Sequence, residues 1–264
     1  MRPNGPVADL VDDLARSVGF LSRLAVPARF FDGHDGSLGR AVRVFPLAGL
    51  VIALPAAALV FLLSSMQAST ALAALLSLMV TIAITGALHE DGLADCADAF
   101  LSGRPRDRIL EILKDSNIGV YGALALVFSV ALRAVALTIV VAACPPALAG
   151  FIVLAAAAWS RAAMVWHWSD LPPARAHGVA ASVGAPENGT MGVALAIGAA
   201  AALVAAWLVA GAIAALVVTG LSFAAVYLWT SYVRSRLGGH TGDTIGAAQQ
   251  LCETAFLVLL ALSL

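Results

Sequence analysis

Long apolar stretches, separated by short polar segments, run through most of the chain. A membrane-spanning helix needs about 20 mostly apolar residues, and seven stretches come near that length. They are residues 44–65, 70–88, 120–143, 149–168, 191–210, 212–230 and 247–264. The pattern predicts an all-α, polytopic transmembrane helix bundle of about seven spans. Because no fixed-period repeat or linker interrupts it, we expect residues 44–264 to form a single transmembrane domain.

Residues 1–43 form a polar arm before the first predicted span. Their arginines and aspartates surround no long apolar run, so we do not expect the arm to act as a signal peptide. Apolar residues recur within it at helical spacing, with Asp12, Asp13 and Arg16 on the other side of the helix. The apolar positions are Val7, Leu10, Val11, Leu14, Val18 and Leu21. This pattern predicts an amphipathic helix that lies flat at the membrane interface, or one that caps the bundle.

The composition supports the membrane assignment. Of the 264 residues, 61% are hydrophobic and 12% are charged, whereas soluble domains average about 45–50% apolar and roughly 25% charged residues. We therefore expect an integral membrane protein with the lipid bilayer as its surroundings. The net charge of −1 gives no reason to expect a nucleic-acid partner. The three cysteines form no CxxC pair, and we interpret them as small apolar residues.

Charged residues are concentrated on one predicted side of the membrane. The arm and the loops 89–119, 169–190 and 231–246 hold 13 of the 15 Lys and Arg residues. By the positive-inside rule this side is cytoplasmic and the C-terminus lies outside. Thirteen of the 16 carboxylates occur in the arm, in the 89–119 loop or at Asp170, which the rule does not require. The chemistry should therefore lie at the cytoplasmic face.

An acidic segment follows the second predicted span. At about 100° per residue, Asp91, Asp95 and Asp98 fall on one helical stripe. Like charges at this spacing repel one another, and a divalent cation would offset the repulsion. Carboxylate oxygens favour Mg²⁺ or Mn²⁺, and Gly92 leaves room beside the stripe. The alternative is a solvated acidic face where the span leaves the bilayer.

The same loop then carries basic residues and a second polar cluster. Arg104, Arg106 and Arg108 precede a short amphipathic helix bearing Ile109, Ile112 and Leu113, and these arginines fit an ordinary positive-inside flank. The loop ends in a segment with residues suited to phosphate binding, where Lys114 offers a positive charge and the two glycines allow close backbone approach. That segment is Lys114-Asp115-Ser116-Asn117-Ile118-Gly119-Val120-Tyr121-Gly122.

A glycine-rich segment opens the last predicted span. Residues 238–246 read Gly-Gly-His-Thr-Gly-Asp-Thr-Ile-Gly, and backbone N–H groups at such a helix start can face an anion. Asp243 is interpreted as a further metal ligand or as a partner of Lys114. Gly-rich turns between helices are common. The segment supports an anion-binding site only because it is predicted to lie on the same membrane face as the acidic helix.

A few ionisable residues lie inside or beside the spans. Arg133 lies deep in the third span, where a charge requires a polar cavity or a partner, and we expect it to face the substrate or a cavity. Arg161 and Glu253 are placed to form an ion pair between spans. His167, flanked by two tryptophans, is interpreted as part of an aromatic interfacial belt. His89 adjoins the aspartates and is a candidate base or supporting residue.

Several motifs, in order, resemble the bacterial cobalamin-5′-phosphate synthases, the adenosylcobinamide-GDP ribazoletransferases. Residues 20–27, FLSRLAVP, resemble the family's FLTRLPVP, and residues 45–50 read FPLAGL at the start of the first span. Residues 89–98, HEDGLADCAD, resemble HLDGLADTxD, and residues 114–122 resemble KDSxxGxxG. Ser160-Arg161, the GGxTGDxLG-like 238–246 segment and Glu253 complete a resemblance that covers nearly the whole chain.

The resemblance implies a polytopic enzyme of the bacterial inner membrane that assembles the cobalamin nucleotide loop. It implies that α-ribazole, or its 5′-phosphate, displaces GMP from adenosylcobinamide-GDP in the presence of Mg²⁺. Asp91, Asp95 and Asp98 are then the expected metal ligands, and Lys114 with Asp115 the phosphate contact and candidate base. The expected substrate-binding residues are Arg23, Ser116, Asn117, Arg133, Arg161, Gly239, Thr241 and Asp243.

The chain departs from the family pattern at Glu90, usually leucine, at Ala25, usually proline, at Asn117, often arginine, and at Ala99, usually glycine. The first adds a possible ligand and the third removes a possible phosphate contact. One alternative function is that of a CDP-alcohol phosphotransferase, which the compact spacing of the aspartates disfavours. A second is a transporter with a cytoplasmic cation site, for which Arg133 would be the only deeply placed charge. The lower base, the general base, the number of metal ions and a homo-oligomeric state stay open.

Overall fold

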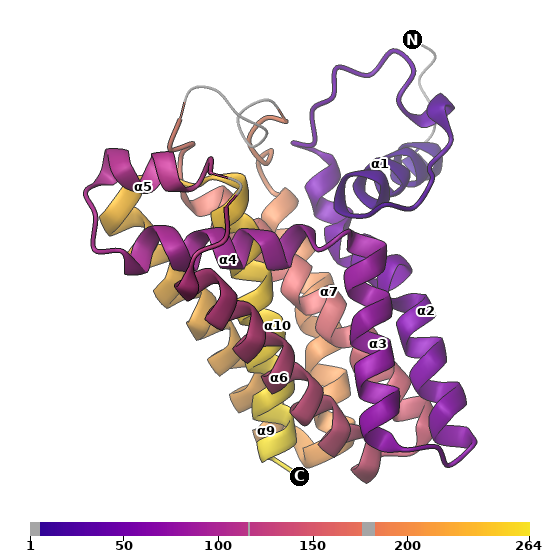
Figure 1. The fold of residues 1–264 in the computed structure, drawn as a ribbon. Coiled ribbons are helices and arrows are strands. Elements are labelled where there is room, and N and C mark those ends of the chain that lie inside the picture. Colours follow the sequence, from indigo (N-terminus) through magenta and orange to yellow (C-terminus); the bar gives the residue numbers. More distant parts are fainter. Residues whose placement is uncertain (1–5, 116, 176–182) are drawn as a thin grey trace.

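The computed structural model describes residues 6–115, 117–175 and 183–264, and these residues form a helical bundle without a β-sheet (Figure 1). The helices are α1 (Pro6–Leu21), α2 (Phe45–Ser65), α3 (Thr70–Thr85), α4 (Leu88–Leu101), α5 (Arg106–Ile112), α6 (Val120–Ala143), α7 (Pro146–Asp170), α9 (Thr190–Leu237) and α10 (Gly242–Leu262). Short 3₁₀ turns occur at Ala28–Phe30 and Ala41–Val44. The all-α prediction is confirmed.

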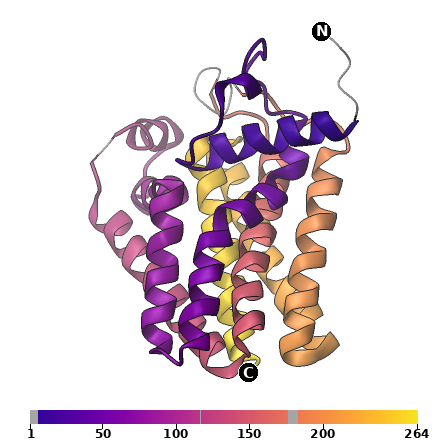
Figure 2. The same ribbon diagram turned by 90° about the vertical axis from the view of Figure 1, so that its right-hand side faces the viewer.

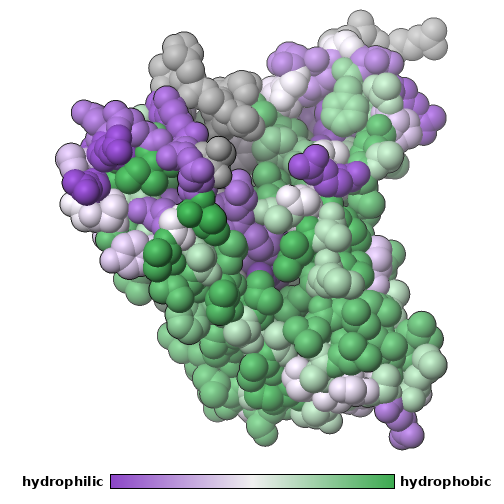
Figure 3. Space-filling view, viewed as in Figure 1, coloured by the Kyte–Doolittle hydropathy of each residue, from purple (hydrophilic) through white to green (hydrophobic). Residues whose placement is uncertain are grey.

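Five helical segments of the described residues are long and apolar enough to cross a membrane. They are Ala41–Ser65, which contains α2, and the helices α6, α7, α9 and α10; the bent pair of α3 and α4 makes a sixth when it is counted as one broken span. Figure 3 shows hydrophobic side chains over the long sides of the bundle and hydrophilic ones gathered around its upper end. The polytopic membrane architecture follows, while the count of seven spans stays a prediction.

A break at Gly211 divides α9 into two halves. Gly211 has φ 83° and ψ 177°, a conformation that interrupts the helix and that glycine adopts without strain. The first half packs on α7 at Gly198, which lies against Ala158 and Ala162. The second half packs on α7 as well, because Trp159 donates a hydrogen bond to Ser222. Figure 2 shows the first half in orange, turning at the lower end of the bundle. This agrees with the predicted division into 191–210 and 212–230.

Helix α7 forms the centre of the bundle and is the most buried of the candidate spans. It packs against α2, α9 and α10. Its small residues allow close helix packing, as is typical of membrane proteins: the Gly49 backbone of α2 approaches the carbonyl of Ala157, and Gly150 approaches the carbonyl of Ala57. This packing holds the first turns of α10 in place, where the polar end of the bundle begins.

A sharp bend between α3 and α4 turns the acidic helix across the end of the bundle. Gly86 and Ala87 both adopt left-handed backbone conformations, with φ 64° and 58°, and the two helix axes differ in direction by 88°. Helix α4 consequently lies across α10 and α6 at the polar end (Figure 1), outside the five candidate spans. The sequence predicted the end of the span near residue 88 but not this change of direction.

Helix α1 lies across the same end of the bundle (Figure 2). The expected helix is present, but its polar residues face the protein: Asp13 is 1% exposed and bonds Arg16, Arg40 and Arg43. The apolar side chains of Val7 and Val11 are exposed instead. Its contacts with α2 and the Ala41–Val44 turn fit the cap of the bundle that the sequence left open, and its position at a membrane interface stays a prediction.

Candidate active site

The acidic helix and the start of α10 meet at a glycine. A Cβ atom at Gly92 would lie 2.8 Å from the carbonyl oxygen of Asp243, so only glycine permits the two backbones to come this close. Gly246, one turn further along α10, faces the Cα atoms of His89 and Gly92. The crossing therefore brings the α4 carboxylates beside Asp243, although about 150 residues separate them in the chain.

Carboxylates from both helices share one electrostatic environment. Partial burial, together with the negative charges of Asp91, Asp243 and Asp98 in that order, raises the pKa of Asp95 to about 7. Nearby like charges disfavour the ionised form of a carboxyl group, and at Asp95 they add to the effect of burial. Asp243 belongs to the same cluster as the three aspartates of α4, as the sequence had suggested.

Asp98 has a second function that the helical stripe did not reveal. Its carboxylate accepts hydrogen bonds from the backbone N–H groups of Gly119, at 2.7 Å, and of Gly122, at 2.9 Å. Gly119 is the N-cap of α6, so Asp98 caps a helix from another element. A Cβ atom at either glycine would lie within 2.4 Å of an Asp98 oxygen. The two glycines thus make room for the carboxylate.

We tested the cluster for its ability to hold a divalent cation. No three His, Cys, Asp or Glu side chains within the described ranges are gathered closely enough to enclose a metal ion on their own. Mg²⁺ in phosphate-transferring sites, however, is usually bound by one or two carboxylates together with substrate phosphates and water. Asp91 is exposed and Asp95 is destabilised as an anion. The oxygen donors present fit an ion that substrate phosphates help to hold.

The glycine-rich segment before α10 is fixed by its backbone. Thr241 caps α10 by a reciprocal arrangement with Thr244, and its hydroxyl donates to Asp243 at 3.1 Å. Gly239 lies so close to Pro172 that a Cβ atom would be 2.5 Å from its carbonyl oxygen. Gly239 and Thr241 therefore position Asp243, and their contact with a nucleotide stays a prediction.

The expected pairing of Asp243 with Lys114 is not present. Asp243 lies 3.9 Å from the guanidinium of Arg175 instead. Sequence reasoning overlooked Arg175, although it is the one Lys or Arg in the 169–190 loop.

The polar segment between α5 and α6 contacts the aspartate cluster through Gly119, which donates a hydrogen bond to Asp98. Lys114, Asp115 and Asn117 are exposed, and Asp115 accepts hydrogen bonds from the Asn117 backbone and side-chain N–H groups. Ser116 lies outside the described residues. Arg23 lies over the α3–α4 bend, where its side chain occupies the space beside Gly86. The roles expected for these residues stay predictions.

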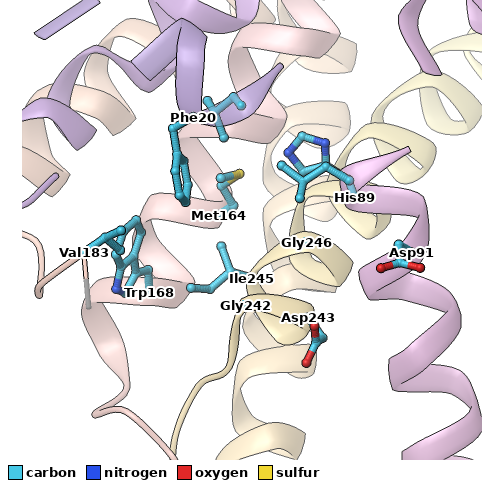
Figure 4. Close-up of a pocket in the computed structure, with 12 residues that line it drawn as sticks. Phe20, His89, Asp91, Met164, Trp168, Val183, Gly242, Asp243, Ile245 and Gly246 are labelled. Atoms are coloured by element: carbon cyan, nitrogen blue, oxygen red, sulfur yellow. The ribbon is translucent and has the colours of Figure 1, made fainter. Parts of the chain in front are cut away.

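A cavity of about 200 Å³ adjoins the crossing of α4 and α10. We call it the His89 cavity. Its lining includes Phe20, His89, Asp91, Met164, Trp168, Asp243 and Ile245. Figure 4 shows His89 across from Phe20, with Met164 and Ile245 between them and the two aspartates beyond Gly242 and Gly246. His89 is 2% exposed, and its Nε2 atom has no hydrogen-bond partner among the described residues.

Arg133 does not face an open cavity. Its side chain is 1% exposed, and its guanidinium lies 3.2 Å from both Glu90 and Glu253. Glu253 also bonds Arg161 at 2.9 Å, which confirms the pair expected between those two spans. These four residues, which we call the buried ion network, join α4, α6, α7 and α10. The arrangement favours a structural role for Arg133 over the substrate contact expected from its depth, and Glu90 is a counter-ion rather than a metal ligand.

The interpretation of His167 as an interfacial anchor is wrong. It is fully buried, and its ring nitrogens lie 2.7 Å and 3.1 Å from the hydroxyls of Thr230 and Thr244. Trp168 is buried as well. Tryptophans on both sides of a histidine are typical of an interfacial belt. The sequence alone does not indicate that α9 and α10 cover the end of α7.

The family model for cobalamin-5-phosphate synthase matches residues 13–261. This chain belongs to that family. Among curated relatives, the adenosylcobinamide-GDP ribazoletransferase of Rhizobium meliloti (strain 1021) is 55% identical over 262 residues, which cover 98% of this chain and 99% of the relative. The protein of the same name from Sinorhizobium medicae (strain WSM419) is 53% identical, and the match covers 98% of this chain and 99% of the relative. The one from Brucella anthropi is 40% identical, and the match covers 97% of this chain and 98% of the relative. No solved structure matches the chain.

Proposed function

We propose that this protein is an adenosylcobinamide-GDP ribazoletransferase. It joins α-ribazole, or α-ribazole 5′-phosphate, to adenosylcobinamide-GDP and releases GMP. The observation that carries the proposal is the meeting of Asp91 and Asp95 with Asp243 at the Gly92 crossing, next to a cavity. The full-length similarity to relatives that carry this name supports it.

The reaction replaces a phosphoanhydride bond with a phosphodiester bond. An oxygen of the ribazole substrate forms a bond to the phosphorus next to the cobinamide arm, the bond between the two phosphates breaks, and GMP leaves with the bridging oxygen. Charge builds up on the transferred phosphoryl group and on the leaving phosphate. A divalent cation, for which we propose Mg²⁺, supplies positive charge at this position. One or two of the carboxylates of Asp91, Asp95 and Asp243 would hold it, together with the phosphates of the substrate.

Other residues orient the reactants around this centre. Asp98 holds the start of α6 beside the acidic helix through Gly119 and Gly122. Arg175, whose guanidinium lies 3.9 Å from the carboxylate of Asp243, offers N–H groups to a phosphate of the substrate. Lys114 is exposed on the segment before α6, where it can contact a phosphate of adenosylcobinamide-GDP. Asp115 stays the candidate acceptor of the proton that the attacking hydroxyl group loses.

The site is proposed to lie at the cytoplasmic face of the bacterial inner membrane. Both expected substrates carry polar, nucleotide-like groups, and the polar end of the bundle contains α4, α5 and the start of α10 (Figure 3). The concentration of Lys and Arg residues in the segments at that end supports the cytoplasmic assignment.

Substitution of the carboxylates tests the proposal. In purified protein supplied with adenosylcobinamide-GDP, α-ribazole and Mg²⁺, we expect Asp91→Asn and Asp95→Asn to lower the rate of GMP release at least about 100-fold, because each removes a charge that holds the ion. Asp107→Asn is the matched control, since Asp107 is an exposed aspartate of the same loop. EDTA should abolish release by the wild type, and added Mg²⁺ should restore it.

Two results would contradict the proposal. Near-normal GMP release by both Asp91→Asn and Asp95→Asn with Mg²⁺ present excludes the carboxylate centre. Wild-type protein that forms no GMP from the two substrates excludes the activity itself.

A further inference from the structure

The His89 cavity contains a buried polar group that neither helix packing nor the carboxylate centre explains. His89 Nε2 has no hydrogen-bond partner among the described residues, although His89 is only 2% exposed. A buried polar atom without a partner destabilises the folded protein, so its presence at the wall of a cavity points to a ligand that pairs with it. The neighbouring walls of Phe20, Met164 and Ile245 are apolar.

We propose that the His89 cavity binds the aromatic base of the ribazole substrate, with His89 Nε2 donating a hydrogen bond to the free ring nitrogen of the base. This inference rests on the proposed function. A benzimidazole riboside has one ring nitrogen bonded to ribose and one with a free lone pair. It therefore presents a flat apolar body and a single hydrogen-bond acceptor, which match the walls and His89.

The other parts of the two substrates fit the cavity less well. A space of about 200 Å³ is too small for a corrin ring. Guanine carries several hydrogen-bond donors and acceptors. Among the described residues, the buried polar atoms without partners at this cavity are His89 Nε2 and the indole N–H of Trp168. The carboxylates of Asp91 and Asp243 lie at the edge of the cavity, so guanine seated between the apolar walls of Phe20 and Met164 would leave polar edges unpaired.

The position of the cavity also suits the geometry of the reaction. Asp91 and Asp243 lie at its edge, beyond Gly242 and Gly246 (Figure 4). A base seated between Phe20 and His89 would place its ribose at that edge. The attacking oxygen of the ribazole substrate then lies on the carboxylate side, where the phosphates of the second substrate are proposed to bind.

A pair of isosteric substrates tests the hydrogen bond. The probes are α-ribosides of benzimidazole and of indole, which have the same shape but differ in the free ring nitrogen. We expect the wild type to show a KM for the indole riboside about fivefold to tenfold above that for the benzimidazole riboside. His89→Phe should reduce this ratio to about one, whereas His89→Gln, which restores an N–H group, should retain most of it. The KM for adenosylcobinamide-GDP should stay unchanged.

Filling the cavity provides a second measurement. Met164→Phe should raise the KM for α-ribazole about tenfold and leave the KM for adenosylcobinamide-GDP unchanged. Met66→Phe, at an exposed turn far from the cavity, is the matched control. The proposal is overturned if the indole-to-benzimidazole ratio is the same in wild type and His89→Phe, or if Met164→Phe raises the KM of both substrates equally.

Equilibrium dialysis of radiolabelled α-ribazole without Mg²⁺ or nucleotide separates this inference from the proposed function. Binding that Met164→Phe weakens and Met66→Phe does not supports the cavity even where GMP release fails. Binding that neither variant changes overturns the cavity assignment even where the carboxylate variants abolish turnover.

Discussion

The aspartates of α4 show how one residue type performs different functions three positions apart. Asp95 and Asp98 lie on the same face of the helix, as their spacing predicts. Asp98 accepts hydrogen bonds from two backbone N–H groups, whereas Asp95 lies close to three other carboxylates, whose charges help to raise its pKa. The spacing could predict a shared face. It could not distinguish the residues, because the N–H groups come from residues 21 and 24 positions away.

The raised pKa of Asp95 predicts a pH-dependent stability without divalent cations. Between the ordinary aspartate value of 3.8 and about 7, the folded protein binds more protons at Asp95 than the unfolded chain. Stability therefore falls as pH rises through this window. We expect the apparent Tm in detergent with EDTA to decrease from pH 4.5 to pH 7 more in wild type than in Asp95→Asn. Mg²⁺ should reduce the wild-type decrease, and equal slopes in the two proteins would contradict the assignment.

At the scale of helices, the site depends on one bend and one crossing. Gly86 and Ala87 turn α4 across the bundle, and Gly92 then admits the start of α10. Long apolar stretches predicted most helices well, because burial in lipid leaves few alternatives for such segments. The direction of α4 was not predictable in the same way, since an amphipathic acidic segment is compatible with continuing a span or leaving it.

Gly92→Ala tests the crossing. The added methyl group meets backbone atoms of Asp243 rather than a flexible side chain, so α4 and α10 must separate. We expect GMP release to fall at least about tenfold, because sub-ångström to ångström displacement of catalytic groups is costly. Gly220→Ala is the control, since its Cβ would meet nothing within 4 Å. Wild-type activity in Gly92→Ala would show that the close approach is not required.

At the scale of the whole molecule, the buried ion network connects the polar end to the core. Glu253 forms ion pairs with both Arg133 and Arg161, whereas Glu90 forms an ion pair with Arg133 and accepts a hydrogen bond from Gln250. The sequence identified Arg161 and Glu253 as partners because both lie at a similar depth. It did not identify Glu90, which stands where the family usually has leucine and was interpreted as a possible ligand.

Glu253→Gln should destabilise the fold more than Glu90→Leu. Loss of Glu253 leaves two buried guanidinium groups without their shared counter-ion, and breaking buried pairs costs about 3–5 kcal/mol. Arg133 keeps Glu253 when Glu90 is replaced, so the loss is smaller. Chemical unfolding in detergent micelles measures the difference, with Glu111→Gln, an exposed residue paired with Arg108, as a near-neutral control. Equal destabilisation by Glu90→Leu and Glu253→Gln would contradict this ranking.

The contact of Asp98 with Gly119 and Gly122 has an evolutionary consequence. The carboxylate occupies the space that a side chain at either glycine would fill, and the two amides supply its hydrogen bonds. Replacement of the aspartate would leave the two glycine amides without their acceptor. Replacement of either glycine would place a side chain where the Asp98 carboxylate lies. We therefore expect Asp98, Gly119 and Gly122, which belong to motifs that look separate in the sequence, to be retained or replaced together.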